Sequence, residues 1–159
     1  MALPTSTEVE FAFARADTRD AAWCLAQYFA ELAARFDEGF DVAADPPTAA
    51  DDMAPPKGAF VIARLDGRPV GCGGLKTLDD ETGEIKRVWT APEARGLGVA
   101  RGMLTRLEEA ARSRGWRRLR LDTNRALIEA RAFYAKEGYR EIPPYNDNPH
   151  AHHWFEKSL

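Results

Sequence analysis

Two glycines, Gly96 and Gly98, lie between a segment that suits a β-strand and a segment that suits a helix. Residues 84–90 are rich in β-branched and aromatic side chains, and Pro92 ends this segment because proline lacks the donor that a strand ladder needs. Glycines at such a junction let the backbone approach a ligand, and the first amides of a helix have no acceptor within it. Residues 95–100 therefore suit an anion, in particular a phosphate. A plain strand-to-helix connection, with glycines for tight packing, fits them equally well.

Neither of the two standard glycine-rich phosphate motifs is present in the chain. There is no G-x-x-x-x-G-K-[ST], and Gly96-Leu97-Gly98 lacks the third glycine of G-x-G-x-x-G. The reading of this turn therefore depends on the elements around it.

The composition is that of one globular domain, which we expect residues 1–159 to form. Of the 159 residues, 45% are hydrophobic and 30% are charged, and the net charge is −3. This balance gives no general case for binding nucleic acid, and no apolar run approaches the roughly 20 residues that cross a bilayer. The first residues lack the features of a signal peptide, and Cys24 and Cys72 form no metal or redox pattern. We therefore expect a cytoplasmic protein without a membrane partner.

Hydrophobic periodicity and turn signals predict a chain of mixed strands and helices. Asp66-Gly67 is a strong hairpin signal and residues 79–83 give a second turn, so three strands form an antiparallel meander. Gly115 and Gly138 end the second and third helices. The predicted strands cover residues 9–14, 58–65, 69–78, 84–90, 116–122, 139–142 and 153–156. Three helices are predicted. The first follows a cap within residues 17–20, the second begins near residue 95, and the third covers residues 125–136.

Smaller patterns add three expectations. Glycines in the third strand suggest a β-bulge or a close backbone approach, namely Gly71, Gly73 and Gly74. Residues 37–52 hold six acidic residues and no lysine or arginine, which fits a solvated surface or a mouth that attracts a cationic substrate. The helix after the glycine turn has one apolar face, formed by Leu97, Ala100, Leu104, Leu107 and Ala111.

Two motifs together resemble one known family. Residues 95–100 read Arg-x-x-Gly-x-Ala after a strand, and residues 130–139 place an aromatic pair four residues before a Gly-Tyr. This resembles the GNAT superfamily of N-acetyltransferases, over essentially the whole chain. The resemblance implies an α/β fold with a mixed, mostly antiparallel sheet of about seven strands flanked by helices. Many relatives carry an asparagine that contacts the cofactor where this chain has Leu127, and Asn124 can replace it from the strand end.

The resemblance implies transfer of an acetyl group from acetyl-coenzyme A to an amine, and this reaction needs a base. A free lysine-like amine has a pKa near about 10.4, so a group that removes its proton, directly or through water, accelerates the attack. Glu84 is the first choice because the family often has an acid at this position. Asp147 and the three histidines near the C-terminus are alternatives for the base. A solvated carboxylate beside a turn explains Glu84 equally well.

The same resemblance assigns an acid and a set of cofactor contacts. Tyr134 matches the position that gives a proton to the leaving thiolate, and a helix aromatic packed in the core, with its hydroxyl on any convenient acceptor, is the alternative. Backbone N–H groups at the end of the central strand suit the thioester oxygen. The cofactor contacts expected on these grounds are Val88, Trp89, Thr90, Arg95, Gly96, Gly98, Val99, Ala100 and Arg101, with Asn124 in addition.

The segment from Pro143 to Trp154 is expected to line the acceptor pocket, as the corresponding loop does in the family. Its substrate contacts would be Tyr145, Asn146, Asp147 and His150, and Tyr28 on the first helix would form the opposite wall. Phe29 is expected in the core. A loop held by its own hydrogen bonds is the alternative. His150, His152 and His153 match no standard metal spacing, so we expect no metal.

The sequence therefore predicts an acetyl-coenzyme A-dependent N-acetyltransferase that works by direct attack. Its partner would be a small-molecule or peptide amine, and two copies can pair as a homodimer, as relatives often do. A non-catalytic module that binds acyl-coenzyme A is the alternative, and it would not require Glu84 or Tyr134. The sequence leaves the identity of the amine open.

Overall fold

The computed structural model describes residues 8–37, 39–40 and 50–159. This part of the chain contains seven strands in one sheet, three α-helices, and two short 3₁₀ helices, Ala50–Met53 (η2) and Pro92–Ala94 (η3). The strands and α-helices are, in chain order, β1 (Val9–Phe13), α1 (Arg19–Arg35), β2 (Gly58–Leu65), β3 (Arg68–Asp79), β4 (Thr82–Thr90), α2 (Val99–Ser113), β5 (Arg118–Thr123), α3 (Ile128–Lys136), β6 (Arg140–Ile142) and β7 (His153–Ser158).

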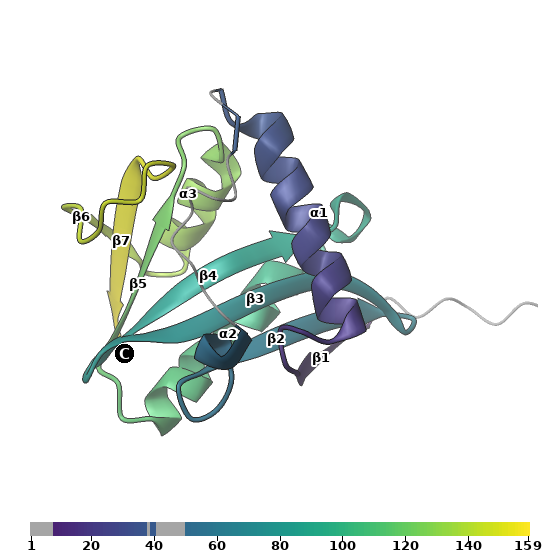
Figure 1. Ribbon diagram of the computed structural model, residues 1–159, viewed down its shortest axis with the longest axis horizontal. Coiled ribbons are helices and arrows are strands. Elements are labelled where there is room, and N and C mark those ends of the chain that lie inside the picture. Colours follow the sequence, from purple (N-terminus) through teal and green to yellow (C-terminus); the bar gives the residue numbers. More distant parts are fainter. Residues whose placement is uncertain (1–7, 38, 41–49) are drawn as a thin grey trace, which may run out of the picture.

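The sheet is open and mostly antiparallel, with the strand order β1-β2-β3-β4-β5-β7-β6 (Figure 1). Strands β1 to β4 are antiparallel neighbours, and β2 to β4 form the meander that the two tight turns predict. Strand β5 lies parallel to β4, since helix α2 connects them as a crossover, and β7 lies antiparallel between β5 and β6. The predicted fold class is confirmed.

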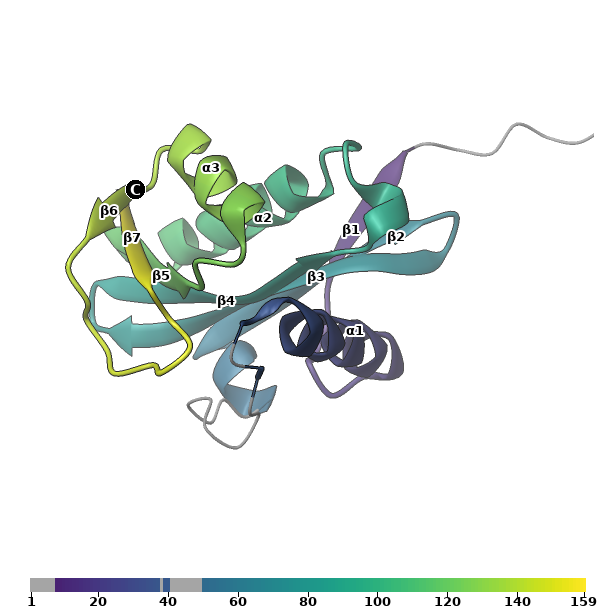
Figure 2. The ribbon, with the colours of Figure 1, turned by 90° about the horizontal axis from the view of Figure 1, so that it is seen from above.

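Helices α2 and α3 lie on one face of the sheet, and α1 and η2 lie on the other (Figure 2). At the glycines of β3, the layers on both faces of the sheet pack closely against the strand. A Cβ on Gly71 would come within 2.9 Å of Val99 on α2, whereas a Cβ on Gly74 would collide with the sulfur of Met53 on η2. The predicted close approach to the β3 backbone is therefore confirmed, because a side chain at Gly71 would collide with α2 and one at Gly74 would collide with η2. We call the two sides the α2 face and the α1 face.

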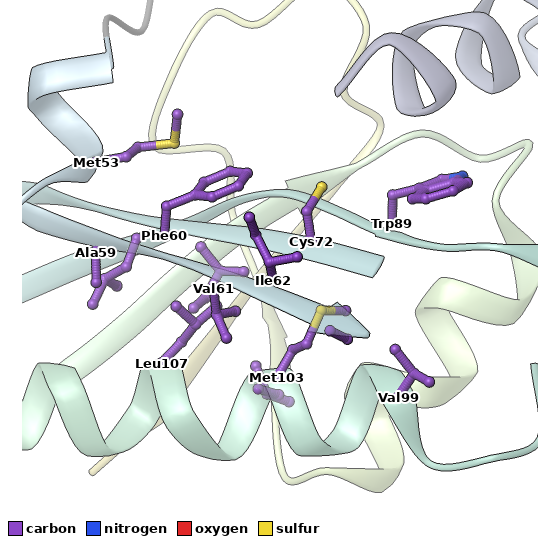
Figure 3. Packing of buried hydrophobic residues seen from close by; sticks show 14 of the residues in the cluster. Met53, Ala59, Phe60, Val61, Ile62, Cys72, Trp89, Val99, Met103 and Leu107 are labelled. Carbon is purple, nitrogen blue, oxygen red and sulfur yellow. The ribbon is translucent and has the colours of Figure 1, made fainter. Parts of the chain in front are cut away.

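The core fills both faces of the sheet. Within the described residues, no helix combines the length and the apolar character that crossing a membrane requires. Buried side chains on the α1 face include Met53, Phe60, Cys72 and Trp89, and those between the sheet and α2 include Val61, Val99, Met103 and Leu107 (Figure 3).

Helix α2 begins at Val99, four residues later than predicted. Gly96 and Gly98 have φ values of 86° and 75°, which a right-handed helix excludes. Leu97 therefore lies outside the helix and is 42% exposed, so its predicted place on the buried face is wrong. Ala100 is only half-buried. The buried apolar face consists of Val99, Met103, Leu104, Leu107 and Ala111.

Helix α3 begins at Ile128, whereas the predicted start was Arg125. The side chain of Asn124 accepts a hydrogen bond of 2.9 Å from Ala126 N–H, and Leu127 N–H donates to the Asn124 carbonyl. Asparagine competes in this way for backbone groups that a helix would use, so a turn replaces the first predicted helical residues. Gly138, with φ 95°, follows the helix as predicted.

Most of the acidic segment at residues 37–52 lies outside the described residues. The described part includes η2, where Asp51 lies 2.8 Å from the guanidinium of Arg15. The two readings of this segment, a solvated surface or a mouth for a cationic substrate, stay predictions.

Candidate active site

Strands β4 and β5 pair only at their first residues and then separate. Their parallel register joins residues 82–84 to residues 118–120, and among the described residues it extends no further. Since β4 continues to Thr90 and β5 to Thr123, a wedge-shaped gap opens between them (Figure 1). Both strands, α1, α3 and the β6–β7 loop contribute side chains to this gap. They are Tyr28, Ile85, Lys86, Arg87, Val88, Leu121, Asp122, Thr123, Leu127, Ala130, Tyr134 and Asn148.

The glycine turn, residues 95–98, follows β4 and leads into α2. Gly98 is the N-cap residue, and no side chain caps the helix. Gly102 N–H donates to the Gly98 carbonyl, so the N–H groups of residues 99–101 have no acceptor within the helix. Apart from the glycine and the residues on either side of it, no described residue has an atom within 4 Å of the place that a Cβ would take on Gly96 or Gly98. The turn thus directs backbone donors and the positive end of the helix dipole into open space, which suits a phosphate.

Two arginines flank the glycine turn, and each pairs with a neighbouring helix. Arg95 lies 2.6 Å from Glu31 on α1, and Arg101 lies 3.5 Å from Glu137 after α3. The arginine side chains are 46% and 72% exposed, so water screens these ion pairs and they contribute little stability. Both arginines remain positive charges beside the turn, where a phosphate would need them.

Glu84 occupies the last position of β4 that pairs with β5, and it is 4% exposed. The Tyr145 hydroxyl donates a hydrogen bond of 2.6 Å to Oε2. The ammonium groups of Lys76 and Lys86 lie 4.0 and 3.7 Å from Oε1. These three neighbours stabilise the charged carboxylate. Glu84 does not itself line the gap, so a proton from the gap has to reach it through a neighbouring group or a water molecule.

Tyr134 reaches the gap from α3, on the α2 face of the sheet. The side chain is buried, and its ring packs against Phe133 and Tyr139 with centroids 5.2 and 5.6 Å away. Burial raises the pKa of the Tyr134 phenol above its ordinary value, so the hydroxyl is protonated at neutral pH. Glu84 points to the opposite face, since it alternates with Ile85 and contacts the loop on the α1 face. Glu84 and Tyr134 therefore approach the gap from opposite faces.

The free edge of β4 directs backbone N–H groups toward the gap. Ala91 N–H donates to the Val70 carbonyl on β3 at 2.8 Å. Successive N–H groups of a strand point to opposite edges, so Trp89 N–H also points toward β3. The N–H groups of Val88 and Thr90 point toward the gap by the same alternation. Within the strand end at residues 88–90, Val88 and Thr90 can therefore direct an N–H group to the gap, and Trp89 cannot.

The loop between β6 and β7 covers the α1 face beside β5. The Asn146 amide donates to Asp122 Oδ2 at 2.7 Å, and the Asn148 amide donates to Oδ1 at 3.2 Å. Tyr145 donates to Glu84, and Asp147 is exposed. Tyr145 and Asn146, which the sequence assigned to the acceptor, thus hold protein partners, and Asn148 is the loop residue that lines the gap.

The three histidines near the C-terminus have different contacts. His150 packs against Phe40 with ring centroids 4.6 Å apart, His152 Nδ1 accepts a backbone hydrogen bond, and His153 Nδ1 lies 2.9 Å from Glu141. His150 and His152 precede β7 and belong to the loop, whereas His153 is the first residue of the strand. In the part of the chain that the structure describes, no group of three or more His, Cys, Asp or Glu residues could hold a metal ion.

Asn124 ties the loop to β5. Its buried side chain donates to the His150 carbonyl at 2.7 Å and accepts from Ala126 N–H. The amide that was expected to contact the cofactor therefore also fixes the end of β5 and the loop beside it.

Helix α1 contributes Tyr28 to the gap. Residues 21, 24, 28 and 32 recur at three- and four-residue steps and form the side of α1 that packs against the core. Phe29 is one residue out of this phase, so its predicted place in the core is wrong. Its ring instead stacks between Tyr28 and Phe40, with centroids 5.3 and 5.7 Å away.

Five polar side chains of the gap are absent from the expectations: Lys86, Arg87, Asp122, Thr123 and Asn148. A signal for Asp122 existed in the sequence, because Arg118, Arg120 and Asp122 alternate with three residues that are buried in β5. Alternation with Glu84 likewise indicates Lys86. The sequence gives no such signal for Arg87, because an irregularity in the pairing of β4 with β3 determines the face to which its side chain points.

The comparisons with known proteins point in one direction. The model of the acetyltransferase (GNAT) family matches residues 24–139. An IAA acetyltransferase of Azospirillum brasilense is 37% identical over 95 residues, which are 58% of this chain and 61% of that protein. The uncharacterized N-acetyltransferase YjgM of Escherichia coli is 31% identical over 123 residues, which are 73% of this chain and 72% of that protein.

A solved acetyltransferase of the GNAT family from Staphylococcus aureus has the same fold. The TM-score is 0.80 at 18% identity, over 96% of this chain and 99% of that one. The chain spans between 52% and 72% of the length of the curated relatives it matches. The family model covers most of the chain, from within α1 to the residue after Gly138, and includes both motifs and the gap-lining residues except Asn148. The chain therefore belongs to the acetyltransferase (GNAT) family.

Proposed function

We propose that the protein is an N-acetyltransferase that moves the acetyl group of acetyl-coenzyme A to the amine of a small-molecule or peptide acceptor. The amine attacks directly, while both substrates are bound. One observation carries the proposal: β4 and β5 separate beside a helix N-terminus whose amides face open space. A thioester that carries phosphates could therefore bind with its phosphates at the glycine turn and its thioester end in the gap between β4 and β5. The curated relatives include an IAA acetyltransferase of Azospirillum brasilense and an uncharacterized N-acetyltransferase of Bacillus subtilis, which agrees with acetyl transfer.

Acetyl-coenzyme A supplies the activated acetyl group as a thioester. The glycine turn is proposed to hold its pyrophosphate through the N–H groups of Gly96, Gly98, Val99 and Ala100. The open space at both glycines fits this role, because a close phosphate would occupy the volume of a Cβ. Arg95 and Arg101 add positive charge, and Asn124 is a proposed contact at the end of β5.

Glu84 is proposed to accept the proton that the acceptor ammonium loses. An amine with a pKa near about 10.4 is charged at pH 7, so it becomes nucleophilic only after this loss. Glu84 is buried behind the gap, so the proton travels through a water molecule held near Lys86 and Tyr145. Asp147 and the histidines remain less favoured, since Asp147 is exposed and each histidine has other contacts.

Tyr134 is proposed to protonate the leaving sulfur. The new N–C bond forms as the C–S bond breaks, the phenol proton passes to the sulfur, and the phenol regains a proton from solvent. A raised pKa keeps the phenol protonated before the reaction. The Val88 and Thr90 N–H groups are proposed to donate to the carbonyl oxygen as its charge grows. Tyr28 and His150 are proposed to contact the acceptor, together with Asn148.

The test measures thiol release from acetyl-coenzyme A across a panel of amines, beside calorimetric titration with coenzyme A. An acetyltransferase binds coenzyme A and releases thiol in proportion to an amine that is consumed. A module that only binds acyl-coenzyme A would give the calorimetric signal with no amine-dependent thiol release, and this result would replace the proposal.

A further inference from the structure

Glu108 is a charged residue on the buried face of α2. The other buried residues of this helix are apolar, and Glu108 lies one turn from both Leu104 and Ala111, where the helical repeat calls for a further apolar side chain. Glu108 is only 8% exposed. Burying a carboxylate is costly, and replacing a buried ion pair by apolar residues of similar volume is often neutral or stabilising. Stability alone therefore does not account for a glutamate at this position.

The Glu108 carboxylate holds the side chain of Tyr139. The Tyr139 hydroxyl donates a hydrogen bond of 2.9 Å to Oε2, and the Lys157 ammonium lies 3.0 Å from the same oxygen. Burial and the Glu108 charge raise the pKa of the Tyr139 phenol, so the hydroxyl remains the donor at neutral pH. Since Tyr139 follows α3 and Lys157 belongs to β7, this one carboxylate connects α2 to both elements.

Tyr139 in turn contacts Tyr134 through its backbone and its ring. Tyr139 N–H donates to the Tyr134 carbonyl at 2.9 Å. The two rings pack edge to face, with centroids 5.6 Å apart and an angle of 70° between their planes. Both side chains are buried. Because a packed core leaves little free space, a displacement of the Tyr139 ring has to displace the Tyr134 ring as well.

The proposed reaction requires α2 and α3 to keep a fixed position relative to each other. The turn before α2 is proposed to hold the phosphates, whereas α3 carries Tyr134, and both helices lie on the same face of the sheet (Figure 2). Arg101 and Glu137 also join the two helices, at 3.5 Å, but the arginine is 72% exposed and water screens this pair. The buried bond between Glu108 and Tyr139 is thus the stronger contact. Misplacing a reacting group by about 1 Å can cost a factor of about 10² in rate.

We infer that Glu108 positions Tyr134 for the reaction, acting through the hydroxyl and the ring of Tyr139. The carboxylate fixes α3 relative to α2, so that a thioester held at the glycine turn presents its sulfur to the Tyr134 hydroxyl. Glu108 does not line the gap, so it is a positioning residue and touches neither substrate. This inference rests on the proposed acetyl transfer and adds a positioning residue to it.

Two variants break the bond from either side. Tyr139→Phe keeps the ring, and Glu108→Leu replaces the carboxylate by an apolar side chain of similar size. The single-turnover rate is expected to fall by about tenfold in each, less than in Tyr134→Phe, because the acid is displaced and not removed. Coenzyme A affinity should change little, since the glycine turn is intact. Glu109→Gln is the matched control, because Glu109 is the next residue of α2 and is exposed.

Double variants separate positioning from a merely structural role. In a Tyr134→Phe background no acid hydroxyl remains to be positioned, so adding Tyr139→Phe or Glu108→Leu should not lower the single-turnover rate further. A further tenfold loss in that background would show that the bond supports the fold in general, and this result overturns the inference.

Fluorine NMR adds a measurement that does not depend on turnover. The chain has four tyrosines, so labelling with a fluorinated tyrosine gives four resonances, which single Tyr→Phe substitutions assign. Glu108→Leu should shift or broaden the Tyr134 resonance, and Glu109→Gln should leave it unchanged. A Tyr134 resonance that is the same in Glu108→Leu and in the wild type overturns the inference.

The outcomes separate the inference from the proposed function. A Tyr134→Phe enzyme with the wild-type rate refutes the proposed acid, and the positioning role falls with it. A slow Tyr134→Phe enzyme beside wild-type rates in Tyr139→Phe and Glu108→Leu overturns the positioning role alone. If acetyl-coenzyme A binds but no amine is acetylated, the proposed transfer fails, and the fluorine spectra decide whether Glu108 sets the position of Tyr134.

Discussion

The Tyr145 hydroxyl donates a hydrogen bond of 2.6 Å to the Glu84 carboxylate, although 61 positions separate the two residues in the chain. Glu84 belongs to the last pair between β4 and β5, and Tyr145 belongs to the loop before β7. The bond therefore joins the loop to the point where the gap begins. Burial, followed by the nearby Glu84 charge, raises the pKa of Tyr145, so the phenol remains the donor across the neutral range.

Tyr145→Phe removes this donor and keeps the ring. The buried carboxylate then loses a charged hydrogen bond, which is typically worth about 1.5–3 kcal/mol, so the free energy of unfolding at pH 7 should fall by about this amount. The hydroxyl no longer holds the carboxylate of the proposed base in place, so kcat should also fall. Urea unfolding and steady-state kinetics measure the two effects, and an unchanged kcat would show that the Tyr145 hydroxyl does not support the proton transfer.

Glu84→Gln tests the proposed base. The variant should lower kcat by about 10²–10⁴, the usual contribution of general base catalysis, and should change KM much less. The acid limb of the rate profile should disappear. Glu81→Gln is a suitable control, since Glu81 lies next to the same strand but is exposed and pairs with Arg117 and Arg118. A Glu84→Gln enzyme with wild-type turnover would assign the role to another group or to bulk water.

Tyr134→Phe tests the proposed acid. Because the ring packing is kept, the folded state and coenzyme A affinity should change little, while kcat falls by about 10², the lower end of the range for acid catalysis. The raised pKa adds a second expectation: no alkaline limb from Tyr134 should appear below about pH 10. Single-turnover kinetics give the chemical rate. Equal single-turnover rates for Phe and Tyr would make the hydroxyl structural.

Gly98→Ala tests the glycine turn as the phosphate site, and Gly67→Ala is the matched control variant. The two glycines have φ values of 75° and 78°, and apart from the adjacent residues no described residue has an atom within 4 Å of either Cβ position. Both variants should lose about 1–2 kcal/mol from the left-handed backbone alone. Only Gly98→Ala should also weaken coenzyme A binding, by about tenfold, because its methyl group occupies the anion's space. Calorimetry compares them, and equal affinities would argue against the turn as the phosphate site.

Tyr139→Phe tests the contribution of Tyr139 to the pH dependence of the free energy of unfolding. Burial, with the Glu108 charge and hydrogen bond next in size, raises the pKa of Tyr139 in the folded state above the unfolded value of about 10. Its contribution is thus complete below about pH 10 and is lost as the pH rises above it, by about 1.4 kcal/mol per unit. The variant should be less stable than wild type at pH 8, and this difference should shrink at pH 11. Urea unfolding at both pH values measures it, and a constant difference contradicts the assignment.

Local sequence signals were sufficient for the order of elements. Asp66-Gly67 and residues 79–83 gave the two turns of the meander, because hairpin turns depend on residues that tolerate positive φ or bind their own backbone. The motif at residues 95–100 identified the family for the same reason, since its glycines adopt the backbone conformation that opens α2. Boundaries were less certain: Asn124 delays α3 through a side-chain bond that helical periodicity does not reveal.

The tertiary structure alone decided which side chains meet at the gap. Tyr145 was assigned to the acceptor, but its hydroxyl contacts Glu84 because the loop folds over the first residues of β4 and β5. Asn146 is held by Asp122 in the same way. Arg87 is the clearest case: a regular strand would point it to the α2 face, and only the extra residue opposite β3 turns it to the α1 face. Sequence determines backbone preference over a few residues, whereas the contacts of a site depend on strand register and on loops that are distant in the chain.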